Sequence, residues 1–174
     1  VTGTVAVLGT LGTVASDSYR IELAKLAPKL TLLQQACPLW VPLVEAGETE
    51  GPGTDYFLRK YLAPLFAPGQ DPPSRILLGC THYPLLAPGI RANVPGGVDV
   101  LAQGPVIAER LEDYLGRHPE MEARVSRGGS FDVLTTDDPG WFREFSARVL
   151  GAPCPATKIR LSPISRAARA PSRF

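Results

Sequence analysis

Residues 76–82 read Ile-Leu-Leu-Gly-Cys-Thr-His, so three apolar residues and a glycine lead directly into a cysteine, a threonine and a histidine. The short apolar run predicts a buried β-strand, which ends at Gly79. In open α/β sheets, ligands bind outside the carboxyl ends of the strands. We therefore expect residues 80–82 at a ligand-binding edge of a sheet, where Gly79 lets the backbone approach a ligand closely.

Apolar runs and amphipathic stretches alternate on both sides of this segment. Further strands are predicted at Val5–Leu8, Leu30–Leu33, Val98–Leu101 and Phe131–Leu134. A helix with Ser16 as its N-cap is predicted at Tyr19–Leu26. Further helices are predicted at Asp55–Leu65, Val106–Leu115 and Trp141–Leu150. Residues 37–47 include Pro38 and Pro42, and we expect them to form a loop with at most a short turn of helix.

This alternating order predicts the α/β class, with three layers and a mainly parallel sheet flanked by helices. The 174 residues are enough for one domain of ordinary size with a sizeable core. Residues 162–174 consist mainly of Ser, Arg, Pro and Ala, with almost no apolar side chain to anchor them. We expect this last segment to be a disordered tail.

The composition narrows the classes of partner and compartment. The formal net charge is +1 without a basic stripe, so neither nucleic acid nor an anionic membrane is an expected partner. The three cysteines lack CxxC spacing, which argues against a disulfide framework or a zinc site and fits a reducing cytoplasm. The chain opens on Val1 in a strand-like run with no charged leader, which indicates a fragment or a truncated reading frame.

Cys80 and His82 form a Cys-x-His pair, whose chemistry depends on the thiolate. A free thiol has a pKa of about 8.5, and a neighbouring imidazole or a helix N-terminus lowers it. His82 can therefore assist Cys80 or relay its proton, and Thr81 offers a hydroxyl and a backbone N–H to a carboxylate. The alternative is structural, since a cysteine is by itself more often a small buried apolar residue and Thr81 can simply cap a helix.

The ten residues 77–86, LLGCTHYPLL, resemble the signature around the second catalytic cysteine of the glutamate racemases, in the aspartate/glutamate racemase superfamily. Three other stretches are similar to the same family: Gly9-Thr10 with Thr13, Ser16 and Tyr19; CPLWVPLVEAG at 37–47; and TTDDP at 135–139 with Phe142 and Leu150-Gly151. The resemblance runs in the family's order from about Val1 to Leu161, which is nearly the whole chain.

The resemblance implies an isomerase that interconverts L- and D-glutamate for peptidoglycan synthesis, without pyridoxal phosphate or a metal as cofactor. In such enzymes two cysteines flank the α-carbon, and one removes the proton while the other returns a proton to the opposite face. By resemblance Cys80 is one of this pair, and Thr81 and His82 contact the substrate. Glu45 matches a family glutamate that orients the imidazole of His82, although a solvent-facing loop acid is the alternative. A homodimer is expected for the full-length enzyme.

The family's Asp-Ser-Gly and Cys-Asn-Thr motifs, which carry the first half of the site, do not occur in this sequence. Neither Cys37, at a non-catalytic family position, nor Cys154, between two prolines, is expected to replace the missing cysteine. The resemblance implies that residues 1–101 form a second lobe with the Cys-Thr-His motif. Residues 102–161 would belong to the first lobe, and without their sheet partners they would leave apolar surface exposed. Within them, Gln103 and its neighbours stand where the family commonly has Asp-Ser.

Other functions remain open at this point. A non-catalytic one-lobe relic that binds a dicarboxylate or a protein is favoured by the missing cysteine motif, whereas the intact LLGCTHYPLL favours an enzyme. The CPLWVPLVE and TTDDP strings argue against a hydantoin or aspartate racemase relative. Residues 9–12, Gly-Thr-Leu-Gly, lack the Gly-Lys-Ser/Thr ending of a P-loop and the third glycine of a dinucleotide fingerprint. They indicate a tight turn that starts a helix.

Overall fold

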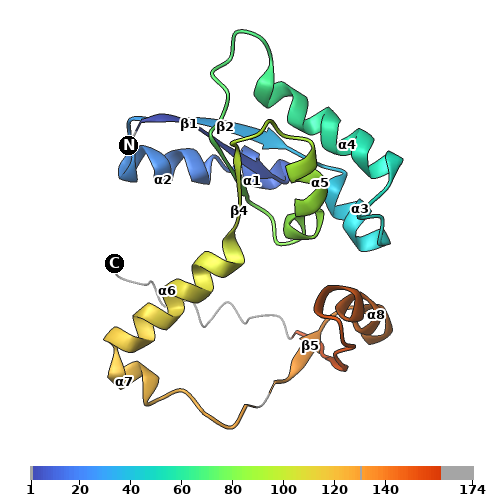
Figure 1. Ribbon diagram of the computed structural model, residues 1–174. Coiled ribbons are helices and arrows are strands. Elements are labelled where there is room, and N and C mark those ends of the chain that lie inside the picture. The colour runs from blue at the N-terminus through green and yellow to red at the C-terminus, as the bar shows by residue number, and fades with distance from the viewer. Residues whose placement is uncertain (1, 130, 162–174) are drawn as a thin grey trace. The chain divides into compact units, whose positions relative to one another are not determined.

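The computed structural model describes residues 2–129 and 131–161, which divide into two compact units (Figure 1). The first unit is Val1–Val125 and the second is Ser126–Phe174. Residues 102–125 thus group with the sheet that precedes them, and the assignment of 102–161 to another lobe stays a prediction. The tail that we expect at 162–174 lies outside the described residues.

A four-stranded parallel sheet forms the centre of the first unit. Its strands are β1 (Gly3–Gly9), β2 (Leu30–Ala36), β3 (Arg75–Leu78) and β4 (Asp99–Ala102). They lie in the order β2-β1-β3-β4, so β1 pairs with β2 on one side and with β3 on the other. The chain therefore reverses its direction of travel across the sheet between β1 and β3, which makes their carboxyl ends the topological switch point.

The two faces of this sheet differ in burial. Ala6, Ile76 and Val100 share one register line and one face, and they are 1%, 0% and 8% exposed. The neighbouring line through Val7 and Leu77 points to the other face, where its last member, Leu101, is 41% exposed. The hydrophobic core of the unit consequently lies on the first face, and the second face is only partly covered.

Helices connect the strands on both sides of the sheet, as Figure 1 shows. The connecting helices are α1 (Leu11–Ala15), α2 (Ser18–Leu26), α3 (Trp40–Ala46), α4 (Pro52–Leu62), α5 (Ala87–Ala92) and the 3₁₀ helices η1 (Ala63–Phe66) and η2 (Tyr83–Leu86). After the last strand of this sheet, β4, come α6 (Gln103–Arg117) and α7 (Pro119–Glu122). Right-handed crossovers put α1 and α2 on one face and α3 to α5 on the other, because the chain moves in opposite directions across the sheet. This arrangement confirms the predicted α/β class, with a parallel sheet flanked by helices.

The segment 37–47 corrects a prediction made from its two prolines. It contains the seven-residue helix α3, which ends at Gly47 in the left-handed conformation with φ of 82°. Pro42 is the third residue of this helix, where the backbone N–H has no intrahelical partner to lose, and Pro38 precedes it. Proline in the first turn therefore starts this helix instead of breaking it.

The turn after β1 also differs from the prediction of one helix capped by Ser16. Thr10 is the N-cap of α1, and its hydroxyl accepts a hydrogen bond from the Thr13 N–H at 3.2 Å. Ser16 ends α1, and Asp17, with φ of 53°, separates it from α2. The predicted tight turn with a helix start is confirmed, but the helix is broken in two because one residue adopts the left-handed conformation.

The described part of the second unit has a parallel strand pair and one helix. The strands are β5 (Val133–Thr135) and β6 (Ala156–Lys158), and α8 (Pro139–Leu150) connects them. Asp138 caps α8 by accepting hydrogen bonds from the N–H groups of residues 140 and 141, both at 3.2 Å. Leu134 and Leu150 are about three-fifths exposed, at 59% and 62%, so apolar side chains of this unit face solvent.

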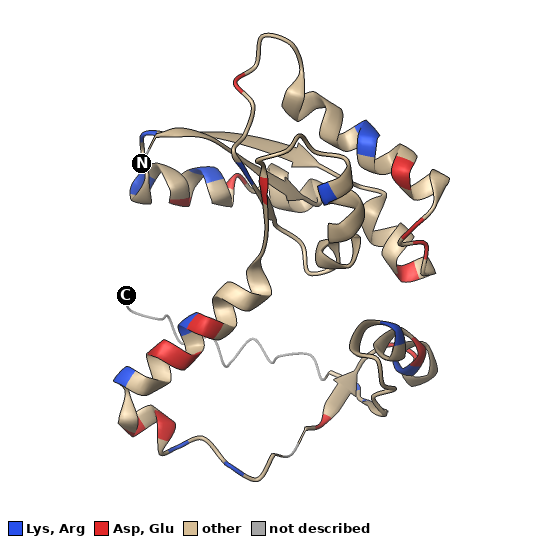
Figure 2. Cartoon of the chain, viewed as in Figure 1, with Lys and Arg blue, Asp and Glu red and all other residues tan. Residues whose placement is uncertain are grey.

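Charges of both signs are interspersed along the chain in Figure 2. On α6, for example, Arg117 pairs with Asp113 at 2.9 Å. Within the described residues no helix combines the length and the apolar character that a membrane span requires.

Gly79 yields a prediction about the fold. A Cβ built on it would lie 2.9 Å from the Leu8 carbonyl oxygen and 3.0 Å from a Val7 methyl. Packing of this position against β1 therefore requires a residue without a side chain. Gly79→Ala should lower the free energy of unfolding by about 1–3 kcal/mol, the usual cost of overpacking, in urea denaturation. Gly96→Ala is the control, because a Cβ there meets nothing within 4 Å. Equal free energies of unfolding for the two variants would contradict the steric requirement for glycine at position 79.

Candidate active site

The buried hydroxyl of Tyr83 holds together the loops that follow three strands. It lies 2.9 Å from the Gly9 carbonyl oxygen and 3.0 Å from the Cys37 carbonyl oxygen, and it donates to them. Gly9 ends β1, Cys37 follows β2, and Tyr83 itself lies just after β3. The Cys37 N–H also donates to the Gly9 carbonyl at 2.9 Å, so the loops are fixed in one cluster. Burial raises the pKa of Tyr83 and keeps this hydroxyl protonated.

An aromatic cluster shields this junction from water. The Trp40 ring meets the Tyr83 ring edge to face, with centroids 4.9 Å apart, and both residues are 0% exposed. Tyr61 packs against Trp40 in the same manner at 6.2 Å. Edge-to-face ring pairs add to the stabilisation that burial itself provides. The loop with the predicted site residues therefore rests on a rigid base.

The structure brings Cys80, His82 and Glu45 together in a line. The Cys80 Sγ lies 3.8 Å from His82 Nδ1, and His82 Nε2 lies 3.4 Å from Glu45 Oε1. When Nε2–H points to the carboxylate, the lone pair of Nδ1 faces the thiol and can take its proton. The His82 and Glu45 side chains are 26% and 44% exposed, so solvent and a ligand reach this line.

Glu45 reaches His82 because residues 40–46 are helical. It is the sixth of the seven residues of α3, and Trp40 at the start of that helix packs on Tyr83, one residue after His82. The contact between the two helical segments α3 and η2 thus sets the distance between carboxylate and imidazole. The orienting role that the resemblance implies for Glu45 stays a prediction.

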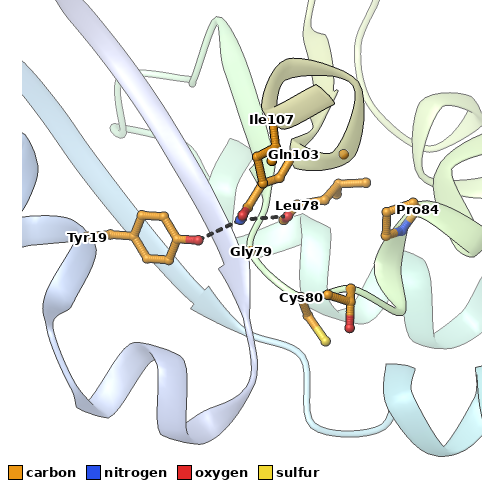
Figure 3. A pocket seen from close by; sticks show the side chains of 9 residues that line it. Tyr19, Leu78, Gly79, Cys80, Pro84, Gln103 and Ile107 are labelled. Atoms are coloured by element: carbon orange, nitrogen blue, oxygen red, sulfur yellow. Dashed lines mark hydrogen bonds between the residues drawn. The ribbon is translucent and has the colours of Figure 1, made fainter. Parts of the chain in front are cut away.

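A pocket of about 260 Å³ adjoins Cys80 and is shown in Figure 3. Thr81, which is exposed, lies on its wall, and its predicted contact with a ligand stays a prediction. Two further wall residues, Tyr19 and Gln103, were not predicted as site residues. Tyr19 was visible in the sequence as an apolar position of a helix and as part of a stretch that resembles the family, whereas Gln103 was visible only as a departure from a family pattern. The sequence signal that could have indicated Gln103 is its place directly after a strand, at the carboxyl edge of the sheet.

The other two cysteines differ from Cys80 in their surroundings. Cys37 is 0% exposed, and burial raises the pKa of its thiol, which therefore stays protonated. Cys154 belongs to the second unit. In residues 2–129 and 131–161 no group of three or more His, Cys, Asp or Glu side chains is arranged to hold a metal ion.

These features define a class of protein. It has a parallel α/β sheet, and at the switch point of that sheet lies a thiol that an imidazole and a carboxylate can assist in moving a proton.

Comparisons with known proteins narrow this class to one family. The curated glutamate racemase of Shouchella clausii is 38% identical over 143 residues, which are 82% of this chain and 50% of that protein. The crystal structure of glutamate racemase isoform RacE1 from Bacillus anthracis matches with a TM-score of 0.79 and 25% identity over 92% of this chain and 58% of that one. That of Thermus thermophilus glutamate racemase, in complex with β-chloro-D-alanine, matches with a TM-score of 0.69 and 32% identity, over 92% of this chain and 57% of that one.

The chain therefore belongs to the glutamate racemase family. It spans about half the length of the curated relatives that it matches, which fits a C-terminal portion of such a protein. No family model matches the chain.

The burial of the three thiols predicts their order of modification. Iodoacetamide should alkylate Cys80 and Cys154 in the folded protein, whereas Cys37 should react only after unfolding in urea, because it is fully buried and its pKa is raised. Peptide mapping by mass spectrometry measures all three sites in one sample. Alkylation of Cys37 at the rate of Cys80 under native conditions would contradict the packing around Tyr83.

Proposed function

We propose that this chain is part of a glutamate racemase, in which Cys80 exchanges the α-proton of glutamate. The observation that carries this proposal is the line from the Cys80 thiol through His82 to Glu45 at 3.8 and 3.4 Å. The names of the curated relatives supply the reaction and the substrate, L- and D-glutamate. The pocket beside Cys80 supplies room for a small amino acid.

The proton transfers follow from this geometry. His82 Nδ1 accepts the thiol proton and leaves a thiolate on Cys80, while the carboxylate of Glu45 stabilises the imidazolium. The thiolate then takes the α-proton of glutamate: an S–H bond forms, the Cα–H bond breaks, and the electron pair stays on Cα, delocalised into the adjacent carboxylate. Return of a proton from the same sulfur regenerates the same enantiomer. Thr81 and its N–H are proposed to bind a substrate carboxylate.

Inversion needs a second base on the opposite face of Cα, and this chain is proposed to supply only one. The wider function proposed for the whole enzyme is the supply of D-glutamate for peptidoglycan, in the cytoplasm, without a cofactor, and as a homodimer. A separate role, the binding of a dicarboxylate or a protein without catalysis, becomes the better assignment if Cys80 exchanges no proton.

The first test follows the α-proton of L- and D-glutamate separately in D₂O with the 174-residue chain. We expect slow replacement of the α-proton by deuterium in one enantiomer, without inversion, measured by NMR and chiral chromatography. Cys80→Ala should reduce the exchange to the rate without protein, and Cys154→Ala, in the second unit, should leave it unchanged. Exchange that persists in Cys80→Ala would refute Cys80 as the base.

A second test concerns the residues behind the thiol. His82→Asn should slow the exchange by about tenfold or more, since general acid–base assistance typically contributes about 10²–10⁴-fold. Glu45→Gln keeps the size of the side chain and removes its charge, so it should slow the exchange by less than His82→Asn does. The exposed pair of His118 and Glu120 provides a matched control in His118→Asn. An unchanged rate in His82→Asn would return His82 to a structural role.

A further inference from the structure

The amide of Gln103 connects three elements on the wall of the pocket. Its Nε2 lies 2.6 Å from the Tyr19 hydroxyl oxygen of α2 and 3.3 Å from the Leu78 carbonyl oxygen at the end of β3, as Figure 3 shows. Gln103 is itself the first residue of α6, and Ile107, one turn later, lines the same pocket. One side chain thus joins α2, β3 and α6 two residues before Cys80.

The direction of these hydrogen bonds is fixed by their chemistry. The Leu78 carbonyl can only accept, so the amide must present its nitrogen and not its oxygen to β3. The nitrogen has two hydrogens, and the second points to the Tyr19 oxygen, which therefore accepts. Both donors of the amide are used, one on each side, so the side chain holds α2 and the end of β3 at a fixed distance.

The Tyr19 hydroxyl also lies close to this strand end. A Cβ built on Gly79 would lie 3.4 Å from the Tyr19 hydroxyl oxygen and 2.9 Å from the Leu8 carbonyl oxygen. The Gly79 N–H donates to that same Leu8 carbonyl at 2.8 Å. The Leu78–Gly79 peptide is therefore held by β1 through the Gly79 N–H and by Gln103 through the Leu78 carbonyl oxygen.

We propose that Gln103 is a positioning residue. Its hydrogen bonds to Leu78 and Tyr19 fix the end of β3, two residues before Cys80, and so keep the thiol within reach of His82. The catalytic meaning of this role rests on the proposed function, in which Cys80 is the base. The positioning of Cys80 itself does not depend on a substrate, because it concerns only the distance between the thiol and the imidazole. Misplacement of a catalytic group by about 1 Å can cost about 100-fold in rate.

The test compares three variants of the full chain by Cys80 alkylation with iodoacetamide at neutral pH, with Cys154 in the same sample as the internal reference. Gln103→Met keeps the length of the side chain and removes both hydrogen bonds. It should lower the Cys80/Cys154 rate ratio by about fivefold or more, since the net loss of even one hydrogen bond changes a population about fivefold. Tyr19→Phe should lower the ratio as well. The double variant should be no slower than the slower single variant, because both changes break the same hydrogen bond.

Gln70→Met is the matched control, since the Gln70 amide also donates to two backbone carbonyls, those of Pro64 and Leu65, but away from this pocket. Its rate ratio should equal that of the wild type. Circular dichroism verifies the fold of each variant, and Tyr19→Phe, the milder change, carries the test if Gln103→Met unfolds. A wild-type ratio in a folded Gln103→Met or in Tyr19→Phe would overturn the proposal, and so would independent, multiplicative effects in the double variant.

The D₂O exchange of glutamate, measured on the same samples, separates this proposal from the function on which it rests. Gln103→Met should lower the exchange rate at saturating glutamate more than it raises the half-saturating concentration. If the wild type exchanges no proton while the alkylation ratios fall as expected, the proposed function fails and the positioning role stands. If the wild type exchanges protons and the ratios do not fall, the positioning role fails and the function stands.

Discussion

The hydroxyl of Tyr83 is the contact on which the geometry of the site depends. It has one hydrogen and two carbonyl oxygens within 3.0 Å, those of Gly9 and Cys37, so it shares or alternates that hydrogen between them. Because the group is buried, a lost partner would not be replaced by water, and the cost of breaking it would be about 1–3 kcal/mol. Tyr83 is three residues after Cys80, and whatever fixes its ring also fixes the end of the loop 79–82, which carries the thiol.

Rigidity is distributed unevenly around this contact. On the face of Ile76 and Val100 the sheet is closed by buried side chains, and the junction of Trp40 and Tyr83 lies in the same core. On the other face Leu101 is exposed, and α6 has no buried residue at all. The line of Cys80, His82 and Glu45 runs along the closed side, through α3 and η2. The Gln103 amide contacts the strand end at the open side, where it also joins Tyr19 of α2.

Much of this architecture follows from local patterns in the sequence. The apolar run at 76–78 and the glycine after it place Cys80 at the sheet edge, and the structure has the strand at Arg75–Leu78. The helix at 40–46 was missed because proline was weighed as a helix breaker without regard to its position in the first turn. The approach of Glu45 to His82 was consequently predicted from the resemblance alone, since the helix that sets this distance was missed. The approach of Gln103 to Tyr19 spans 84 positions in the chain, and no local pattern reports a contact of that range.

The buried state of Cys37 determines what chemistry the first unit can perform by itself. Racemisation needs proton donors on both faces of Cα, and Cys37 is the other cysteine of this unit. Its sulfur is 0% exposed and 3.7 Å from the Gln35 carbonyl oxygen, and burial raises its pKa, so it neither meets a ligand nor ionises. Under the proposed function, one competent thiol would return each proton to the face of Cα from which it came. Burial would then determine the stereochemical outcome, because the same packing on Tyr83 that orders the Cys80 loop keeps Cys37 away from any ligand.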